Sequence, residues 1–451
     1  MEKNKKLLIL SSVIILALLA GVAAVRISGG NLNSLFFKRI AYEKGGNYGS
    51  KAGDKPNNNA GRSDGGGIGR SQEGSNSQGS GAAGGSKSGA KDGKAVEGNT
   101  GQQKKRFEDI KVKAIYLTGV SAGNNKVIDH VIDLANTTEL NAVVIDIKEG
   151  GLVNYKSDVP EVKSNKLYTA YYDAQRVVKK LHDNNIYVIG RIVCFRDNGL
   201  ATKRADLAIK RPNGTLWREG KMGAWTNPYN KEVWKYNIDI AKEAVDKGFD
   251  EIQFDYVRFP TARESEVDYG KSAPSKVDAI CGFLKAAGKE LREGKGALVS
   301  ADVFGIICES RRDGEAIGQD LEKIGKDIDY VCPMVYPSHY ANASKGVMGN
   351  GYGQTINGVL FTAPDLKPYE VVYNTLIKAK ERISKTEGYR AKVRPYLQDF
   401  TASYIRDKNY YQVYGPTQVR QQIKAVYDAG YEEWILWNGN NVYSEKALLK
   451  K

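Results

Sequence analysis

The sequence predicts a (β/α)8 barrel (TIM barrel) over residues 107–451, preceded by an N-terminal membrane anchor and a disordered linker. Eight short apolar runs rich in β-branched and aromatic residues indicate strands, at 113–118, 142–148, 187–195, 251–259, 298–304, 330–336, 393–400 and 433–438. Amphipathic helical patterns lie between them, at 125–136, 171–184, 231–247, 275–294, 319–326, 368–385 and 416–429. The composition also changes abruptly at residue 107. A doubly wound sheet is the alternative, but no Gly-rich phosphate-binding fingerprint follows the first run.

Residues 1–26 read as a signal anchor. Several lysines precede an uncharged, largely apolar run from Leu7 to Val25, which is long enough to span a bilayer as a helix. The lysines favour a cytoplasmic N-terminus. We therefore expect a single-pass protein of the cell membrane whose folded part is extracellular. The alternative is a cleaved signal peptide, since Val22-Ala-Ala24 suits a signal peptidase, and the folded part would then be secreted.

Residues 27–106 are expected to form a flexible linker. From residue 44 onward this stretch is mostly Gly, Ser, Asn and Lys, and it cannot bury a core. It also contains much of the basic charge. The whole chain has a formal charge of +15, but Lys and Arg only slightly outnumber Asp and Glu after residue 106. This distribution favours an anionic membrane or cell wall as the partner and argues against nucleic acid.

Four cysteines and three histidines leave little for metal binding. Cys194, Cys281, Cys308 and Cys332 show no metal-ligand spacing and are expected to be buried free thiols. We predict no metal site and no cofactor. A metal-dependent hydrolase is a weak rival, since such sites need clusters of His and Asp.

Polar and aromatic side chains gather at the C-terminal ends of the predicted strands. This end is the catalytic face of a (β/α)8 barrel. We expect a polyhydroxylated substrate to be bound there by Asp146, Glu149, Arg258, Tyr336, His339, Asp399, Trp437 and Asn438. Trp217 and Trp225, in the long loop after the third strand, are further candidates for stacking on sugar rings.

Asp255 and Asp302 are the predicted catalytic pair. They lie toward the ends of the fourth and fifth strands, and neighbouring strands are about 4.8 Å apart. Glycosidic cleavage uses two carboxylates, about 5–5.5 Å apart in retaining enzymes. Alternatively, Asp255 pairs structurally with Arg258, and Asp302 caps the segment that follows it.

Asp146 and Glu149 have two interpretations. They contact substrate, or they form ion pairs with Lys148 between them in the sequence.

The strings at these strand ends resemble a bacterial family described as a putative glycosyl hydrolase domain, itself similar to α-amylase-type barrels. They are Lys113-Ala-Ile-Tyr-Leu-Thr-Gly119, Ala142-Val-Val-Ile-Asp-Ile-Lys148, Phe254-Asp-Tyr-Val-Arg-Phe-Pro260, Ala301-Asp-Val-Phe-Gly305 and Pro333-Met-Val-Tyr-Pro-Ser-His-Tyr340. The resemblance covers nearly all of residues 107–451. It implies a barrel fold and hydrolysis of glycosidic bonds more firmly than a substrate.

Carried over by position, the resemblance makes Asp255 the nucleophile and Asp399 a stabilising acid. Two positions depart from the α-amylase pattern. Asp302 stands where a Glu acid/base is expected, which leaves Glu309 as an alternative acid, and Gln253 stands where an Arg is expected.

The sequence therefore predicts a glycoside hydrolase that cleaves a polysaccharide at or near the bacterial cell surface. Two rivals need no catalytic acids, a non-catalytic carbohydrate-binding barrel and a wall-anchored interaction protein. The oligomeric state is left open.

Overall fold

The computed structural model describes residues 107–270 and 274–451. The predicted anchor and the linker up to residue 106 lie outside the described residues. Within the ranges that are described, no helix is long and apolar enough to cross a membrane.

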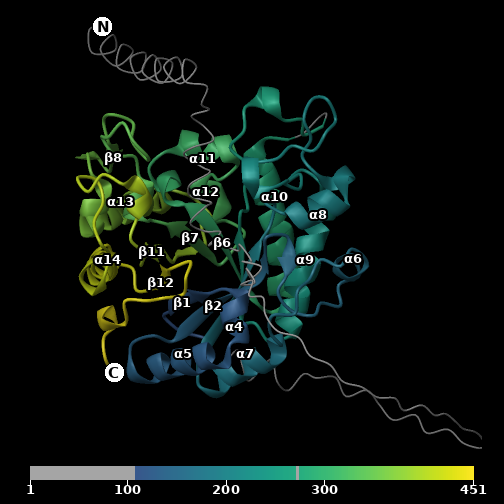
Figure 1. Cartoon of the computed structure of the whole chain (residues 1–451), viewed down its shortest axis with the longest axis horizontal. Coiled ribbons are helices and arrows are strands. Elements are labelled where there is room, and N and C mark those ends of the chain that lie inside the picture. Colours follow the sequence, from purple (N-terminus) through teal and green to yellow (C-terminus); the bar gives the residue numbers. More distant parts are fainter. Residues whose placement is uncertain (1–106, 271–273) are drawn as a thin grey trace, which may run out of the picture. The chain divides into compact units, whose positions relative to one another are not determined.

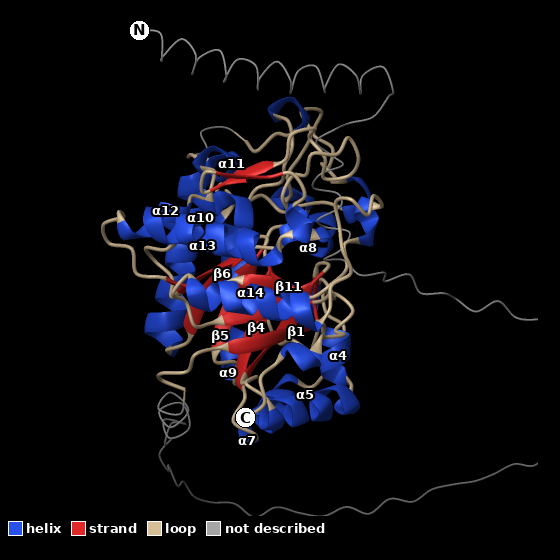
Figure 2. Cartoon of the chain, turned by 90° about the vertical axis from the view of Figure 1, so that its left-hand side faces the viewer, coloured by secondary structure: helices blue, strands red, loops and turns tan. Residues whose placement is uncertain are grey.

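Eight parallel strands close into a barrel, as predicted. Each strand pairs with the next along the chain, and β1 also pairs with the last, β12, which closes the ring. In Figure 1 the strands occupy the centre with helices around them, and Figure 2 shows the same strands from the side. The barrel strands are β1 (Lys113–Leu117), β2 (Ala142–Glu149), β4 (Tyr187–Val193), β5 (Glu251–Asp255), β6 (Leu298–Phe304), β7 (Tyr330–Met334), β11 (Tyr396–Gln398) and β12 (Trp434–Trp437).

Helices connect successive strands across the outside of the barrel. They are α4 (Gly119–Gly123), α5 (Asn125–Thr137), α6 (Pro160–Ser164), α7 (Ala174–Asp183), α8 (Asn198–Lys203), α9 (Lys231–Asp246), α10 (Lys276–Gly288), α11 (Arg311–Ile317), α12 (Leu321–Ile324), α13 (Pro368–Ser384) and α14 (Pro416–Asp428). Side-chain caps fix several starts: Asp173 accepts from the backbone of Arg176 at the start of α7. The helices α7, α9 and α14 end just before Asn185, Gly248 and Gly430, which have the positive φ that ends a helix.

In two of the predicted strands, a local cause shortens or divides the strand. β5 ends at Asp255 because Tyr256 has a φ of 49°, which turns the chain away from the sheet. The seventh predicted strand is split into β10 (Lys392–Val393) and β11, with Pro395 in the gap. Proline has no N–H to donate to a neighbouring strand.

Small elements decorate the long loops. β3 (Leu152–Val153) folds back antiparallel on the end of β2, and β8 (Gln354–Ile356) pairs antiparallel with β9 (Val359–Phe361) in the loop before α13. An Asn213-Gly214 turn lies in the loop after β4, with Gly214 at a φ of 80°.

The tryptophans of that loop are part of the core. Trp217 and Trp225 are 5% and 0% exposed, so the expectation that they stack on sugar rings is wrong. The indole N–H of Trp225 donates to Glu219 at 3.0 Å, which satisfies its polar end inside the protein. Among the thiols, Cys194, Cys308 and Cys332 are buried and free as expected, whereas the free Cys281 is only partly buried.

Candidate active site

Arg191 lies at the centre of the acidic cluster, a residue that the sequence reasoning missed. It sits in the middle of β4, fully buried, and its side chain contacts carboxylates from two neighbouring strands. Nη1 donates to Asp146, and to Glu149 Oε2 at 3.0 Å. Nη2 and Nε donate to Asp255 Oδ2, at 2.7 and 3.1 Å. The one available signal was a charged residue inside an otherwise apolar strand, Tyr187-Val-Ile-Gly-Arg-Ile-Val193.

The guanidinium stays charged in spite of its burial. Burial alone would lower the pKa of Arg191, but Asp146, Asp255 and Glu149 outweigh it and raise that pKa well above its usual value. The flat face of the guanidinium also lies 5.6 Å from the ring of Tyr116 and 5.5 Å from that of Trp437. These two rings stack on each other with centroids 4.0 Å apart and support the arginine.

Asp255 and Asp302 meet at this arginine. The pairing of β5 with β6 matches Phe254 with Ala301, so the two aspartates that follow lie at the same level of adjacent strands. Asp302 Oδ2 lies 4.0 Å from Arg191 Nε, the nitrogen that also donates to Asp255. The two carboxylate oxygens are therefore no further apart than the sum of those two distances. Both residues are almost fully buried, at 2% and 1% exposure.

The structural alternative paired Asp255 with Arg258. In the structure, Asp255 pairs with Arg191 instead. Arg258 is buried, and its guanidinium lies 4.7–5.0 Å from the rings of Phe304, Tyr256 and Trp225. Its Nη1 donates to the carbonyl of Phe259. Burial lowers the pKa of Arg258.

Asp146 completes the cluster, and its pKa is raised. Burial raises the pKa of Asp146 to about 6, and the nearby Glu149 adds to the increase against the opposing effect of Arg191. The hydroxyl of Tyr116 donates to Asp146 Oδ2 at 2.5 Å. The ion pair considered between Asp146 and Lys148 does not form, because Lys148 is bound to Asp197 at 2.6 Å.

Glu149 lies nearer the surface and bridges two arginines. One carboxylate oxygen accepts from Arg191 and the other from Arg196 Nη2, each at 3.0 Å, and 20% of its side chain is exposed. Burial opposes ionisation of Glu149, but Arg191 and Arg196 prevail and lower its pKa. Arg196 also lies 3.8 Å over the ring of Tyr256, which turns away from the end of β5.

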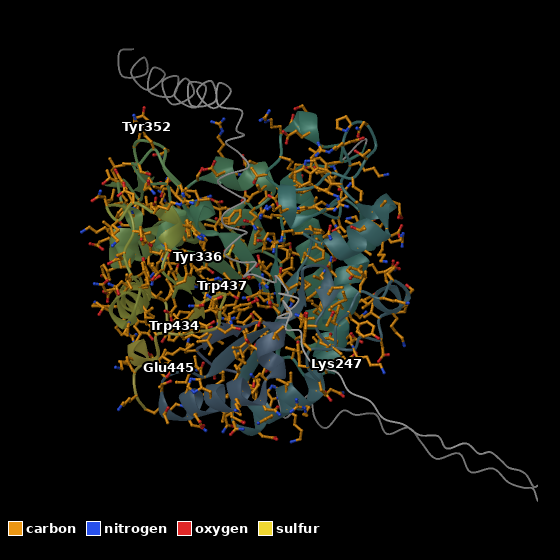
Figure 3. All side chains as sticks on the ribbon, viewed as in Figure 1. Lys247, Tyr336, Tyr352, Trp434, Trp437 and Glu445 are labelled. Carbon is orange, nitrogen blue, oxygen red and sulfur yellow. The ribbon has the colours of Figure 1, made fainter. Side chains whose placement is uncertain are left out.

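Tyr336 and His339 lie in the segment that follows β7. The Tyr336 hydroxyl is buried and has no hydrogen-bond partner within the part of the chain that the structure describes. Burial, then the charges of Asp302 and Asp255, raise the pKa of Tyr336, so its hydroxyl lies within electrostatic range of both acids. The ring of His339 packs edge-on against Tyr336 at 4.9 Å. Figure 3 shows Tyr336 and Trp437 near the middle of the barrel, away from Lys247 and Glu445.

The remaining predicted contacts are tied into the loop after β12. Asp399 accepts from the backbone N–H and the hydroxyl of Ser444 at 2.8 and 2.7 Å, and Asn438 donates to the carbonyl of Asp399 at 2.6 Å. Burial raises the pKa of Asp399. Glu309, the alternative acid, accepts from the backbone of Asn357 in the β8–β9 turn at 2.9 Å. The carboxylates of Asp399 and Glu309 are therefore bound by loop residues, Ser444 and Asn357 respectively.

The family model described as the putative glycosyl hydrolase domain matches residues 114–443. The chain belongs to this family. It is thus a glycoside hydrolase by family, which agrees with carboxylates clustered in a (β/α)8 barrel.

Three solved structures are similar to this chain. A hypothetical protein from Ruminiclostridium thermocellum is 46% identical over 42% of this chain and 97% of its own, with a TM-score of 0.39. The PgaB (BpsB) glycoside hydrolase domain of Bordetella bronchiseptica is 12% identical, covers 73% of this chain and 94% of its own, and has a TM-score of 0.51. A chitinase from Chromobacterium violaceum is 13% identical over 75% and 97%, with a TM-score of 0.41. Among curated proteins, no match was found.

Proposed function

We propose that this glycoside hydrolase cleaves a polysaccharide at or near the bacterial cell surface, with Asp255 and Asp302 as its carboxylate pair. The observation that carries the proposal is the approach of both carboxylates to one nitrogen of Arg191, toward the C-terminal ends of β5 and β6. The upper limit on their separation admits the roughly 5–5.5 Å of retaining enzymes and only the lower end of the roughly 6.5–9.5 Å range of inverting enzymes. The stereochemistry of the product distinguishes the two.

Asp255 and Asp302 are assigned different roles because Arg191 lies closer to Asp255 than to Asp302. Asp255 accepts two charge-assisted hydrogen bonds, which stabilise the ionised form that a nucleophile or base needs. Asp302 lies 4.0 Å from the guanidinium, beyond hydrogen-bond distance, and is assigned the proton that the leaving oxygen receives. Tyr336, with its buried hydroxyl near both acids, and the partly exposed Glu149 are assigned to binding the sugar on either side.

The location at the cell surface is proposed from the sequence. Residues 1–26 would hold the enzyme at the membrane, and the linker would let it reach polymer within a limited radius, where tethering raises the effective substrate concentration.

The test uses the full chain, wild type beside Asp255→Asn, with a panel of purified bacterial wall polysaccharides and exopolysaccharides. New reducing ends report cleavage, and co-sedimentation with insoluble polymer reports binding. We expect wild type to release reducing ends from at least one polymer, and Asp255→Asn to bind that polymer without cleaving it. Binding by both proteins with no release by either would favour a non-catalytic carbohydrate-binding barrel.

A further inference from the structure

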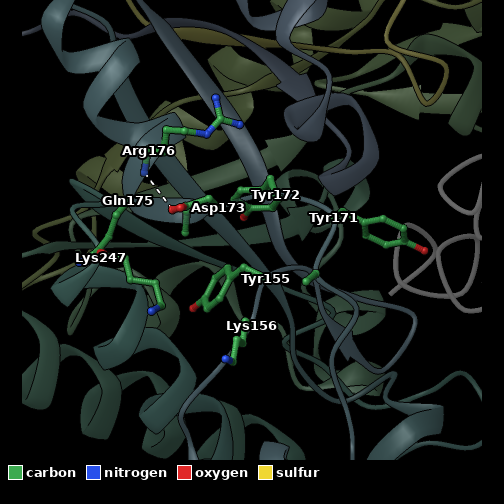
Figure 4. A pocket seen from close by; sticks show the side chains of 10 residues that line it. Tyr155, Lys156, Tyr171, Tyr172, Asp173, Gln175, Arg176 and Lys247 are labelled. Atoms are coloured by element: carbon green, nitrogen blue, oxygen red, sulfur yellow. Dashed lines mark hydrogen bonds between the residues drawn. The ribbon is translucent and has the colours of Figure 1, made fainter. Parts of the chain in front are cut away.

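A cavity lies outside the barrel, between the segment after β3, the start of α7 and the end of α9. It has a volume of about 400 Å³. Its residues come from three separate parts of the chain, and Figure 4 shows Lys156 and Lys247 on either side of Tyr155. None of the lining residues contributes a side chain to the carboxylate cluster around Arg191.

Aromatic side chains form the floor and rim of this cavity. Tyr155 and Tyr172 are buried and pack edge to face with centroids 6.0 Å apart. Tyr172 is fixed by a hydrogen bond from its hydroxyl to the backbone carbonyl of Asp146 at 3.0 Å. Tyr171 is 43% exposed at the rim. A rigid aromatic floor beside an exposed ring suits the apolar faces of a sugar.

Three cations line the same cavity without a close carboxylate. Lys156 has no ion pair within the described ranges, Arg176 bonds to the neutral Asn125 Oδ1 at 3.0 Å, and Lys247 comes only to 4.0 Å from Glu243. The Lys247 ammonium lies 5.3 Å from the Tyr155 ring centroid. The nearest acid of the lining, Asp173, caps α7.

The lysines just outside the cavity behave differently. On α7, Lys179 pairs with Asp183 at 2.6 Å and Lys180 pairs with Asp129, while Lys163, near the end of α6, pairs with Asp158 at 3.1 Å. Cations with carboxylate partners are thus common around the cavity, whereas Lys156 and Arg176 have none within the described residues and Lys247 has only the 4.0 Å contact with Glu243. Positive charge concentrated over an aromatic floor attracts an anion.

Tyr155 supplies a second, independent feature. Its hydroxyl is buried in a residue that is 1% exposed, and no group in the described part of the chain meets hydrogen-bond geometry with it. Burial raises the pKa of Tyr155 well above its usual value, and the charge of Glu243 and a polar contact with its carboxylate add to the increase, so the hydroxyl keeps its proton. Because that contact falls short of good hydrogen-bond geometry, a ligand that accepts from this buried hydroxyl in better geometry would be favoured.

We propose that this cavity is a second, non-catalytic binding site for a sugar that carries an anionic group. Lys156, Lys247 and Arg176 would hold the carboxylate or phosphate, Tyr155 would donate to it, and the tyrosine rings would contact the sugar. Such a site holds the barrel on an acidic polymer and is independent of cleavage.

The test is calorimetric titration of the full chain with glucuronate, glucose 6-phosphate, glucose and inorganic phosphate. We expect saturable binding of both acidic sugars, at least about tenfold weaker binding of glucose, and inorganic phosphate weaker than its sugar ester. In Lys156→Gln/Lys247→Gln, acidic sugars should bind about tenfold or more weakly, because charge-assisted hydrogen bonds are lost. Tyr155→Phe should weaken binding by about fivefold.

The matched control is Lys179→Gln/Lys180→Gln, which removes two paired lysines of α7 and should leave binding within about twofold. Lys156→Gln alone, an exposed position, keeps the test valid if the double variant fails to fold. The proposal is overturned if neither acidic sugar binds saturably, if glucose or inorganic phosphate binds as tightly as the acidic sugars, or if the control loses as much affinity as the cavity variant. Since nothing is cleaved in this titration, its result is independent of glycosidase activity.

Discussion

Oδ2 of Asp255 accepts hydrogen bonds from both Nη2 and Nε of Arg191, at 2.7 and 3.1 Å, although the arginine belongs to the preceding strand of the barrel. The α-amylase-type pattern expects an arginine two residues before the nucleophile, where this chain has Gln253. Gln253 instead accepts from Tyr396 and contacts Cys332 inside the barrel. The positive charge beside Asp255 is thus retained but comes from β4.

Removing the arginine should destabilise the fold strongly. Arg191→Gln leaves Asp146 and Asp255 buried without their cation, and breaking a buried ion pair from one side costs about 3–5 kcal/mol. Lys235→Gln breaks an exposed pair with Asp239 and should cost at most about 1 kcal/mol. Urea unfolding of the two variants beside wild type measures both losses. Similar small losses in the two would show that the cluster does not depend on Arg191.

The loop before α13 should give a pH-dependent stability through Asp365. Burial raises the pKa of Asp365 from 3.8 to about 6, with neutral donors such as Gln398 and Gln412 opposing the shift. A raised folded-state pKa means that the stabilising contribution is fully present below about pH 4 and is lost as the pH rises through about 6. Asp365→Asn removes this titration. Between about pH 4 and pH 7, the free energy of unfolding of the variant should therefore improve relative to wild type by about 3 kcal/mol.

Chemical denaturation at a series of pH values measures this difference. Gln412→Ala removes a donor to the Asp365 carbonyl but no titrating group, so its difference from wild type should stay level with pH. A level difference for Asp365→Asn as well would contradict the raised pKa.

Gly151, in the turn between β2 and β3, should be intolerant of a side chain. Its φ is 85°, and an added Cβ would lie 2.3 Å from the backbone nitrogen of Gly199. Gly151→Ala should cost about 2–4 kcal/mol, from the left-handed conformation and from the clash. Gly214→Ala has a similar φ of 80° with nothing within 4 Å and should cost only about 1–2 kcal/mol. Equal losses in thermal or urea unfolding would show that the backbone contact yields.

Periodicity predicted the barrel but not the partners of its charged side chains. Alternating strands and helices suffice for the fold, because each apolar run must be buried against its neighbours. Sequence spacing gives no information on which arginine reaches which acid. Asp255 bonds to Arg191, which is 64 residues away, and not to Arg258 nearby. Trp225 was misjudged for a related reason, since a tryptophan in a long loop can turn inward when Glu219 satisfies its indole.

One comparison of variants distinguishes Asp255 and Asp302 from the other predicted acids most directly. On the polymer that wild type cleaves, initial rates of reducing-end release are measured for Asp255→Asn, Asp302→Asn and Asp399→Asn, each with the wild-type fold checked by circular dichroism. We expect losses of about a hundredfold or more for the first two, as for acid–base and nucleophilic groups, and a much smaller loss for Asp399→Asn, whose carboxylate is bound to Ser444. Near-wild-type rates in either Asp255→Asn or Asp302→Asn would contradict their assignment as the catalytic pair.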